Sequence, residues 1–153
     1  MIEVWRITAP EYADTAFSGE GARLWGGRWG SEGRRLVYTA GSLSLALLEV
    51  LAGAGDRHRL RGYLAVKASF DEHHLDTLDT ASLPTGWDAR PYTGVSQAVG
   101  DRWLDEQSSL ALRVPSVVVP TEWNVLLNPE HPAFEEIVFD VPTAAPFDPR
   151  LLG

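Results

Sequence analysis

The sequence predicts an α+β fold, because segments with strand character and segments with helix character follow one another without regular strand–helix–strand alternation. Strand character is strongest in residues 2–8, where side-chain types alternate, and in the apolar, β-branched residues 111–119. Helix character is strongest in residues 43–51 and 96–106. We therefore expect a mixed central sheet with flanking helices.

The first half of the chain is expected to contain two strands, a loop and a helix. In the strand of residues 2–8, Arg6 lies on the same face as Ile2 and Val4. Residues 19–33 hold six glycines and predict a loop with aromatic and basic side chains. The remaining features are a short strand over residues 36–39 and a helix over residues 43–51, which Ser42 caps and Gly53 and Gly55 end.

The second half is expected to alternate between regular and irregular segments. Strands are expected at three places: residues 61–70, 111–119 and 136–141. The helix over residues 96–106 is expected to turn Val99, Trp103 and Leu104 inward. Irregular structure is expected at two places: residues 71–88 and 123–129.

Length and composition limit the classes of protein that this chain can represent. Its 153 residues fit one domain, residues 1–153, with room for a sizeable core. The net charge of −8 argues against nucleic-acid binding, which requires a concentrated positive surface. The absence of cysteine excludes a thiolate metal site and a cysteine nucleophile. Because neither a leader peptide nor a run of about 20 apolar residues is recognisable, we expect a cytoplasmic protein that does not bind membranes.

Glu49 is the most informative single residue of the sequence. Its neighbours one turn away on the predicted helix are all small or apolar: Leu45, Ala46, Ala52 and Gly53. A helix that is apolar all round is normally buried, and an unpaired carboxylate there is costly. Glu49 therefore either forms a structural ion pair with an arginine or serves as a catalytic carboxylate in a cleft, and we favour the cleft.

Arg28 lies in the glycine-rich segment Gly26-Gly27-Arg28-Trp29-Gly30. Glycines let a backbone approach a ligand closely, and a guanidinium offers two parallel donors to a phosphate or carboxylate. Trp25 and Trp29 could stack on a planar base. The segment matches neither the P-loop nor the dinucleotide-binding fingerprint, so an ordinary turn is the competing interpretation.

Three further residues are candidates for a binding site. Arg6 shares its strand face with apolar residues, which is explained by an exposed edge or by pairing with Glu49 or a ligand phosphate. Tyr38, in the middle of a short strand, is either a core aromatic or a surface on which a ligand stacks. Ser116 lies in a β-branched run, where its hydroxyl needs a partner that the backbone could supply.

Two other kinds of site are not expected. His58, His73, His74 and His131 show no ligand spacing with acidic residues, so no metal site is predicted. The chain also lacks the Gly-x-Ser-x-Gly turn of a serine hydrolase.

Four motif-like segments follow one another along residues 5–132. They are Trp5-Arg6-Ile7, residues 19–29, Val37-Tyr38-Thr39 with residues 44–49, and Val114-Pro115-Ser116 with Asn124 and Asn128-Pro129. Their order and spacing resemble those of the RES-domain family, the toxin half of bacterial toxin–antitoxin pairs, named for an arginine, a glutamate and a serine. One departure is Gly30, where the family often has asparagine.

The resemblance implies a fold similar to that of ADP-ribosyltransferases, with NAD⁺ bound in a central cleft and no metal. It maps the family's arginine to Arg28, its glutamate to Glu49 and its serine to Ser116, and these are the expected catalytic residues. Arg6 and Tyr38 match further NAD⁺-contacting positions, so the expected NAD⁺-binding residues are Arg6, Arg28, Tyr38 and Glu49.

The chemistry of NAD⁺ cleavage suits these side chains. Breaking the nicotinamide–ribose bond passes through an oxocarbenium-like state, which the Glu49 carboxylate would stabilise. Arg28 and Arg6 would hold the pyrophosphate. Tyr38 would stack on nicotinamide or ribose, and Ser116 would hydrogen-bond the cofactor or Glu49.

The residues leave several alternatives open. Ser44 and Ser96 also lie in motif-like segments and compete with Ser116 for the family's serine. The implied enzyme depletes NAD⁺ by hydrolysis, or by phosphorolysis with phosphate as co-substrate, or it transfers ADP-ribose to a protein. A different class is a non-catalytic nucleotide-binding module in which Arg28 and Glu49 form an ion pair. The resemblance also implies a cognate antitoxin with a helix-turn-helix domain of the Xre type, which would cover the cleft.

Overall fold

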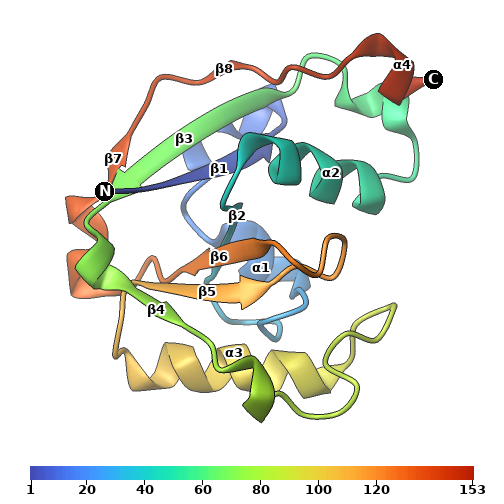
Figure 1. Cartoon of the computed structure of the whole chain (residues 1–153). Coiled ribbons are helices and arrows are strands. Elements are labelled where there is room, and N and C mark those ends of the chain that lie inside the picture. The colour runs from blue at the N-terminus through green and yellow to red at the C-terminus, as the bar shows by residue number, and fades with distance from the viewer.

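One sheet of eight strands runs through the molecule, with helices packed around it (Figure 1). The computed structural model describes residues 1–153. The strands are β1 (Ile2–Thr8), β2 (Val37–Ala40), β3 (Leu64–Phe70), β4 (Leu75–Thr77), β5 (Ala111–Pro115), β6 (Trp123–Leu127), β7 (Val138–Phe139) and β8 (Thr143–Ala144). The α-helices are α1 (Glu20–Trp25), α2 (Leu43–Gly53), α3 (Gly94–Glu106) and α4 (Pro149–Leu152). The α+β class that the sequence predicts is confirmed.

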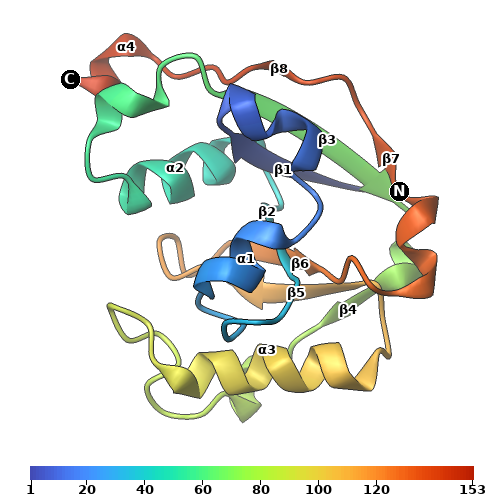
Figure 2. The ribbon, with the colours of Figure 1, turned by 180° about the vertical axis from the view of Figure 1, so that it is seen from behind.

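The sheet consists of two halves that meet at a single point. Its strand order is β4-β5-β6-β2-β1-β3-β7, with β8 paired to β3, and only β4 and β5 run parallel. β1 pairs with β3 over its whole length, but β1 and β2 share only the pair of Trp5 and Ala40. The β1–β3 half therefore diverges from the half that holds β2, β4, β5 and β6, here called the β5–β6 half. Figures 1 and 2 show the β1–β3 half above the β5–β6 half.

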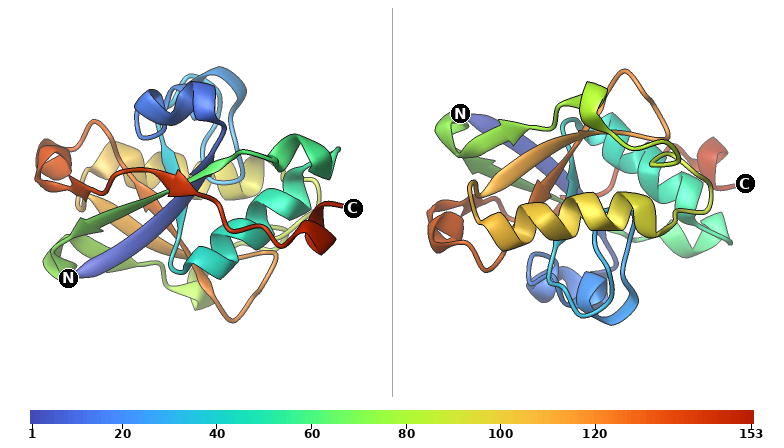
Figure 3. Two further views of the ribbon diagram at one scale, coloured as in Figure 1. Left: turned by 90° about the horizontal axis from the view of Figure 1, so that it is seen from above. Right: turned by 90° about the horizontal axis from the view of Figure 1, so that it is seen from below.

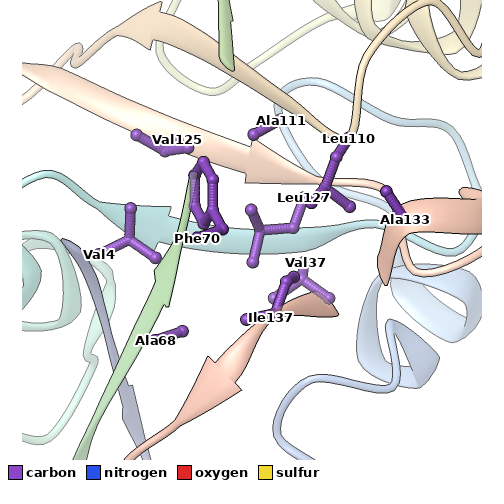
Figure 4. Packing of buried hydrophobic residues seen from close by; sticks show 10 residues of the cluster. All are labelled: Val4, Val37, Ala68, Phe70, Leu110, Ala111, Val125, Leu127, Ala133 and Ile137. Carbon is purple, nitrogen blue, oxygen red and sulfur yellow. The ribbon is translucent and has the colours of Figure 1, made fainter. Parts of the chain in front are cut away.

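One end of the space between the halves is filled by an apolar cluster, here called the inter-sheet core (Figure 4). Phe70 of β3 lies beside Val125 and Leu127 of β6, and Val4 of β1 and Val37 of β2 lie close by. All five side chains are at most 2% exposed. Because burying each such side chain contributes about 1.5–3 kcal/mol, this cluster holds the two halves together.

Two helices complete the packing. α3 turns Trp103 and Leu104 onto the β5–β6 half, as the helical spacing predicts, and crosses its strands in the view from below (Figure 3). α2 packs through Leu45 and Ala46, and Figures 1 and 2 both show it at a level between β3 and β6. The expectation that α2 is buried all round is wrong, because Leu48 is 43% exposed on its outer face.

Several elements lie where the sequence places them. β1 has the predicted bounds, and the amide of Leu45 donates to the Ser42 hydroxyl at 3.1 Å, which confirms Ser42 as the cap of α2. β2, β3, α3 and β7 overlap the predicted segments. The strand expected to run to residue 119 ends at Pro115, because the hydroxyl of Ser116 accepts the amides of the next turn.

Three segments differ from the prediction. Residues 123–129, expected to be irregular, contain β6, which pairs on both sides with β2 and β5. The predicted loop over residues 19–33 begins with α1, where Glu20 and Arg23 form an ion pair one turn apart. β4 lies within the polar segment 71–88 because it finds a parallel partner in β5. In each case a tertiary or side-chain contact outweighs the local composition.

No helix of the chain has the length and apolar character that crossing a membrane would require.

Candidate active site

The glycine-rich segment around Arg28 is fixed from below by α3. The Ser96 hydroxyl donates to the Arg28 carbonyl at 2.6 Å, and the Gln97 side chain donates to the Gly27 carbonyl at 3.1 Å. Gly100 lets the helix approach closely, since a Cβ there would lie 1.5 Å from the carbonyl oxygen of Trp29. The segment is therefore held by hydrogen bonds and by close packing against α3.

Tyr38 of β2 fixes the same segment from the sheet. Its hydroxyl accepts the amide of Trp29 at 3.0 Å, and Gly27 lies so close that a Cβ would come within 2.5 Å of the hydroxyl oxygen. Burial is the main cause that raises the pKa of Tyr38, so the side chain stays a neutral phenol.

Arg28 points from this segment to the loop that precedes α3. Its two terminal nitrogens donate to the carbonyls of Trp87 and Ala89 at 2.9 and 3.0 Å. It forms no ion pair. Desolvation and then the nearby charge of Arg90 lower its pKa. Two guanidiniums thus lie close together without a carboxylate bound to either.

Glu49 lies on α2 and is partly exposed to a cleft. Its carboxylate accepts the side-chain amide of Asn124 at 2.6 Å, and it forms no ion pair with an arginine. The structural Glu–Arg pair considered from the sequence, including the pair of Arg28 and Glu49, is therefore not present. Asn124 holds the carboxylate in place without neutralising its charge.

Arg6 lies two residues after Val4 on the face of β1 that enters the inter-sheet core. One terminal nitrogen donates to the Tyr38 carbonyl at 2.9 Å. Its Nε is buried without a hydrogen-bond partner, and burial lowers the pKa of the guanidinium. Arg6 pairs neither with Glu49 nor with any other acid.

These side chains line two adjoining cavities. The inner pocket, about 170 Å³, is bounded by Arg6 together with mostly apolar residues of β1, β2 and α2. The outer cleft, about 830 Å³, is bounded by Arg28, Arg90, Tyr92 and the loop after β5. Tyr38, Glu49 and Asn124 line both cavities and therefore form the boundary between them.

Ser116 lies outside both cavities. It is fully buried, and its hydroxyl accepts the amides of Val118 and Val119 at 3.1 and 3.0 Å. This turn places Val117 and Val118 in the wall of the outer cleft, where the Val117 carbonyl accepts a side-chain nitrogen of Arg90 at 2.6 Å. The structure thus brings Arg6, Arg28, Tyr38 and Glu49 together and places Ser116 behind the cleft wall.

Several residues of the site were not predicted in their roles. The sequence marks Asn124 only as part of a motif. Arg90 and Tyr92 carry no sequence signal, because they lie in a loop that reaches the cleft from elsewhere in the chain. Ser96, an alternative for the family's serine, helps to position Arg28, because its hydroxyl donates to the backbone carbonyl of Arg28. No three histidine, acidic or cysteine side chains gather in the way a metal ion would need.

Comparisons with known proteins agree with one another. A sequence profile of the RES domain matches residues 3–148. A protein named "Toxin Res" from Yersinia enterocolitica is 37% identical over 97% of this chain and 98% of its own length. A second "Toxin Res", from Photorhabdus laumondii, is 39% identical over 88% and 86%. The "Prs ADP-ribosylating toxin" of a Sphingobium strain is 36% identical over 97% and 95%.

A solved structure shares the fold at lower identity. The crystal structure of the M. tuberculosis MbcT–MbcA toxin–antitoxin complex contains a chain that superposes with a TM-score of 0.76 at 20% identity. The match covers 98% of this chain and 86% of that one. The family resemblance of the four motif segments is thereby confirmed, and the chain belongs to the RES-domain family.

Proposed function

We propose that the chain is the toxin enzyme of a toxin–antitoxin pair and that it cleaves the bond between nicotinamide and ribose in NAD⁺. One observation carries the proposal: the Glu49 carboxylate lies at the boundary of two cavities, between the unpaired guanidinium of Arg6 and those of Arg28 and Arg90. In NAD⁺ the cationic glycosidic centre complements Glu49, and the anionic diphosphate complements Arg28 and Arg90.

The outer cleft suits the diphosphate and the adenosine. A diphosphate carries two negative charges, and Arg28 and Arg90 are the two guanidiniums that line this cleft. Arg28 uses two of its five donors on backbone carbonyls and keeps three for the ligand. Tyr92, which is 41% exposed at the cleft, offers a ring on which adenine can stack.

The boundary between the cavities is where the bond breaks. The pair of electrons of the bond between C1′ and the pyridinium nitrogen goes to that nitrogen, and neutral nicotinamide leaves. Glu49 stabilises the positive charge that develops on the ribose. An acceptor oxygen then bonds to C1′ and gives up its proton to Glu49. Tyr38, neutral and held by Trp29, forms a fixed wall beside the ribose.

The group that bonds to C1′ of the ribose determines which reaction takes place. Water gives hydrolysis, phosphate gives phosphorolysis, and a side chain of another protein gives ADP-ribosylation. The name of the Sphingobium relative, an ADP-ribosylating toxin, favours transfer to a protein as the second candidate. Ser116 is proposed to act at a distance, by shaping the turn that forms the cleft wall.

A partner is part of the proposal. We propose an antitoxin that covers the cleft, with the helix-turn-helix domain of the Xre type that the family resemblance implies. The exposed apolar residues Tyr92 and Val118 line the outer cleft and would be covered by the antitoxin. Co-expression with the neighbouring gene should restore growth and yield a stable complex.

Nicotinamide release by the purified chain tests the activity. We expect NAD⁺ consumption whose products, with and without phosphate and with lysate protein, identify the acceptor by mass spectrometry. Glu49→Gln keeps an acceptor for Asn124 but loses the charge, and should lower the rate about 10³-fold. The matched control Glu106→Gln, on the exposed C-terminal turn of α3, should leave the rate unchanged. An unchanged rate in Glu49→Gln contradicts the proposal.

A further inference from the structure

Two residues that line the inner pocket each carry a buried polar side-chain atom without a hydrogen-bond partner, and the two atoms are of opposite kind. The Nε of Arg6 is a donor, and the Oδ1 of Asn124 is an acceptor. They are the two buried side-chain atoms of the chain that lack a partner. Leaving such an atom unpaired is costly, and each such group in a native structure calls for an explanation.

From this pair we infer that the inner pocket reads the carboxamide of nicotinamide, with Asn124 accepting from its amino group and Arg6 donating to its carbonyl oxygen. This inference rests on the proposed function. It assigns to Asn124 and Arg6 the recognition of nicotinamide as the group that leaves. A primary carboxamide carries a donor, its amino group, and an acceptor, its carbonyl oxygen, on the same carbon, and this pair is chemically complementary to one unpaired acceptor and one unpaired donor.

The walls of the inner pocket favour the pyridine ring over the ribose. Most of its lining is apolar, with Trp5, Ile7, Ala46 and Val50 among its residues. A flat aromatic ring is stabilised by such walls, whereas a hydrated ribose is not. The volume of about 170 Å³ is sufficient for one six-membered ring with a small substituent and too small for a nucleoside.

The position of the pocket agrees with the order of groups along NAD⁺. With the ring in the inner pocket, the ribose lies at Glu49 and Tyr38, which line both cavities. The diphosphate then reaches Arg28 and Arg90 in the outer cleft. The Asn124 side chain would link the two tasks, because its amide nitrogen holds Glu49 and its oxygen, which has no partner within the chain, is the acceptor assigned to the leaving group.

The two hydrogen bonds should affect different kinetic constants. When the glycosidic bond breaks, its electron pair enters the ring, so the carbonyl oxygen becomes a better acceptor for Arg6 in the transition state, and Arg6 raises kcat. The amino group donates to Asn124 in bound substrate and transition state alike, so Asn124 acts on KM and on the choice of substrate.

An NAD⁺ analogue tests the assignment. In 3-acetylpyridine adenine dinucleotide a methyl group replaces the amino group and the carbonyl remains. We expect wild-type protein to favour NAD⁺ over this analogue by about 10-fold or more in kcat/KM, because the analogue leaves Asn124 Oδ1 unpaired. Asn124→Ala should remove most of this preference. If Asn124 only positions Glu49, the variant slows both substrates equally and the preference stays, which overturns the inference.

A matched control comes from the same pocket. Thr39 also lines the inner pocket, but its hydroxyl is engaged with the Val125 carbonyl at 2.7 Å. Thr39→Val should therefore leave the preference for NAD⁺ over the analogue unchanged. A preference lost equally in Thr39→Val and Asn124→Ala would indicate a general disturbance of the pocket and would overturn the assignment to Asn124.

Binding of the free bases gives a second measurement that needs neither turnover nor a variant. Ligand-observed NMR on wild-type protein should show tighter binding of nicotinamide than of 3-acetylpyridine, by about 10-fold. Equal binding of the two overturns the inference, while NAD⁺ consumption that depends on Glu49 leaves the proposed function intact. The proposed function itself fails if wild-type protein consumes no NAD⁺.

Discussion

The two ends of the space between the sheet halves are built by the same strands and differ in almost every physical property. At one end Val4, Phe70 and Leu127 form the dry inter-sheet core. At the other end Arg6, two residues after Val4 on the same face of β1, borders the inner pocket. One strand thus carries the chain from a region that stabilises the fold to a region of unpaired polar atoms.

The contrast shows how stability and chemistry are divided in this molecule. The apolar end gains free energy from every side chain it buries, whereas the cleft end holds partly buried guanidinium groups and a carboxylate without ion pairs, which costs free energy. The cleft residues are therefore expected to lower stability and to support function. Substitutions at the two ends should separate these two effects.

The largest effect is expected in the inter-sheet core. Phe70→Ala removes a 2% exposed ring between the halves and should lower the free energy of unfolding by about 3–5 kcal/mol. The turnover of NAD⁺ per folded molecule should stay near wild type. Urea unfolding with activity measured below the transition checks both. Phe139→Ala, whose ring is 42% exposed, is the control and should cost less than half as much.

The elements of the fold were predictable where local sequence decides them. Ser42 caps α2 through its own side chain, and the alternation of residues 2–8 marks β1 without reference to the rest of the chain. β6 is not predicted because a strand of only five residues, beginning at Trp123 and followed by Asn128-Pro129, gives a weak local signal. Its pairing with β2 and β5 is what forms the strand. Tertiary contacts of this kind are not readable from one segment.

The sequence predicts which charged side chains form the candidate site, but it does not predict which residues they contact. Glu49 stood out because a carboxylate on an apolar helix needs an explanation, although the helix is less buried than its sequence indicates. Its true partner, Asn124, lies 75 positions away and shares no local pattern with it. Gly100 is similar, since only the carbonyl of Trp29 packed against it explains why a glycine stands inside α3.

At the cleft end the largest loss is expected for Arg28. Arg28→Ala removes the donors to the carbonyls of Trp87 and Ala89. It also removes one of the two guanidinium groups that are proposed to bind the diphosphate. The kcat/KM for NAD⁺ should fall about 10²-fold, or about 2.7 kcal/mol. Arg28→Lys should restore little, because an ammonium cannot span two carbonyls and a phosphate.

The exposed Arg102 of α3 provides the control for that variant. Arg102→Ala removes the same charge from an exposed side chain that pairs with Glu106 on α3, so it should leave kcat/KM unchanged. A loss of similar size in Arg102→Ala would mean that overall charge, and not the contacts of Arg28, governs binding.

Arg6→Met extends the apolar end toward the cleft and should raise stability. The variant replaces a buried guanidinium with an unpaired Nε by an apolar chain of similar length. The variant also removes the hydrogen bond to the Tyr38 carbonyl, which offsets part of the gain. We expect up to about 1 kcal/mol of added stability, together with the loss of most NAD⁺ turnover. Urea unfolding and nicotinamide release measure the two. The control is Arg113→Met, which removes the arginine of β5 that lies over the ring of Trp123 on β6, and it should not stabilise the protein.

The smallest effect distinguishes a catalytic serine from a structural one. Ser116→Ala removes the acceptor of two amides and should lower stability by about 1 kcal/mol. Ser109→Ala, at a buried serine that accepts the Trp103 indole and donates to the Ala111 carbonyl, should cost a similar amount. If Ser116 acts only by shaping the cleft wall, its variant keeps turnover within about 3-fold of Ser109→Ala, a difference of about 0.7 kcal/mol. A loss of 100-fold or more at unchanged stability would instead place the Ser116 hydroxyl in contact with the substrate, which requires the turn of residues 116–119 to rearrange when NAD⁺ binds.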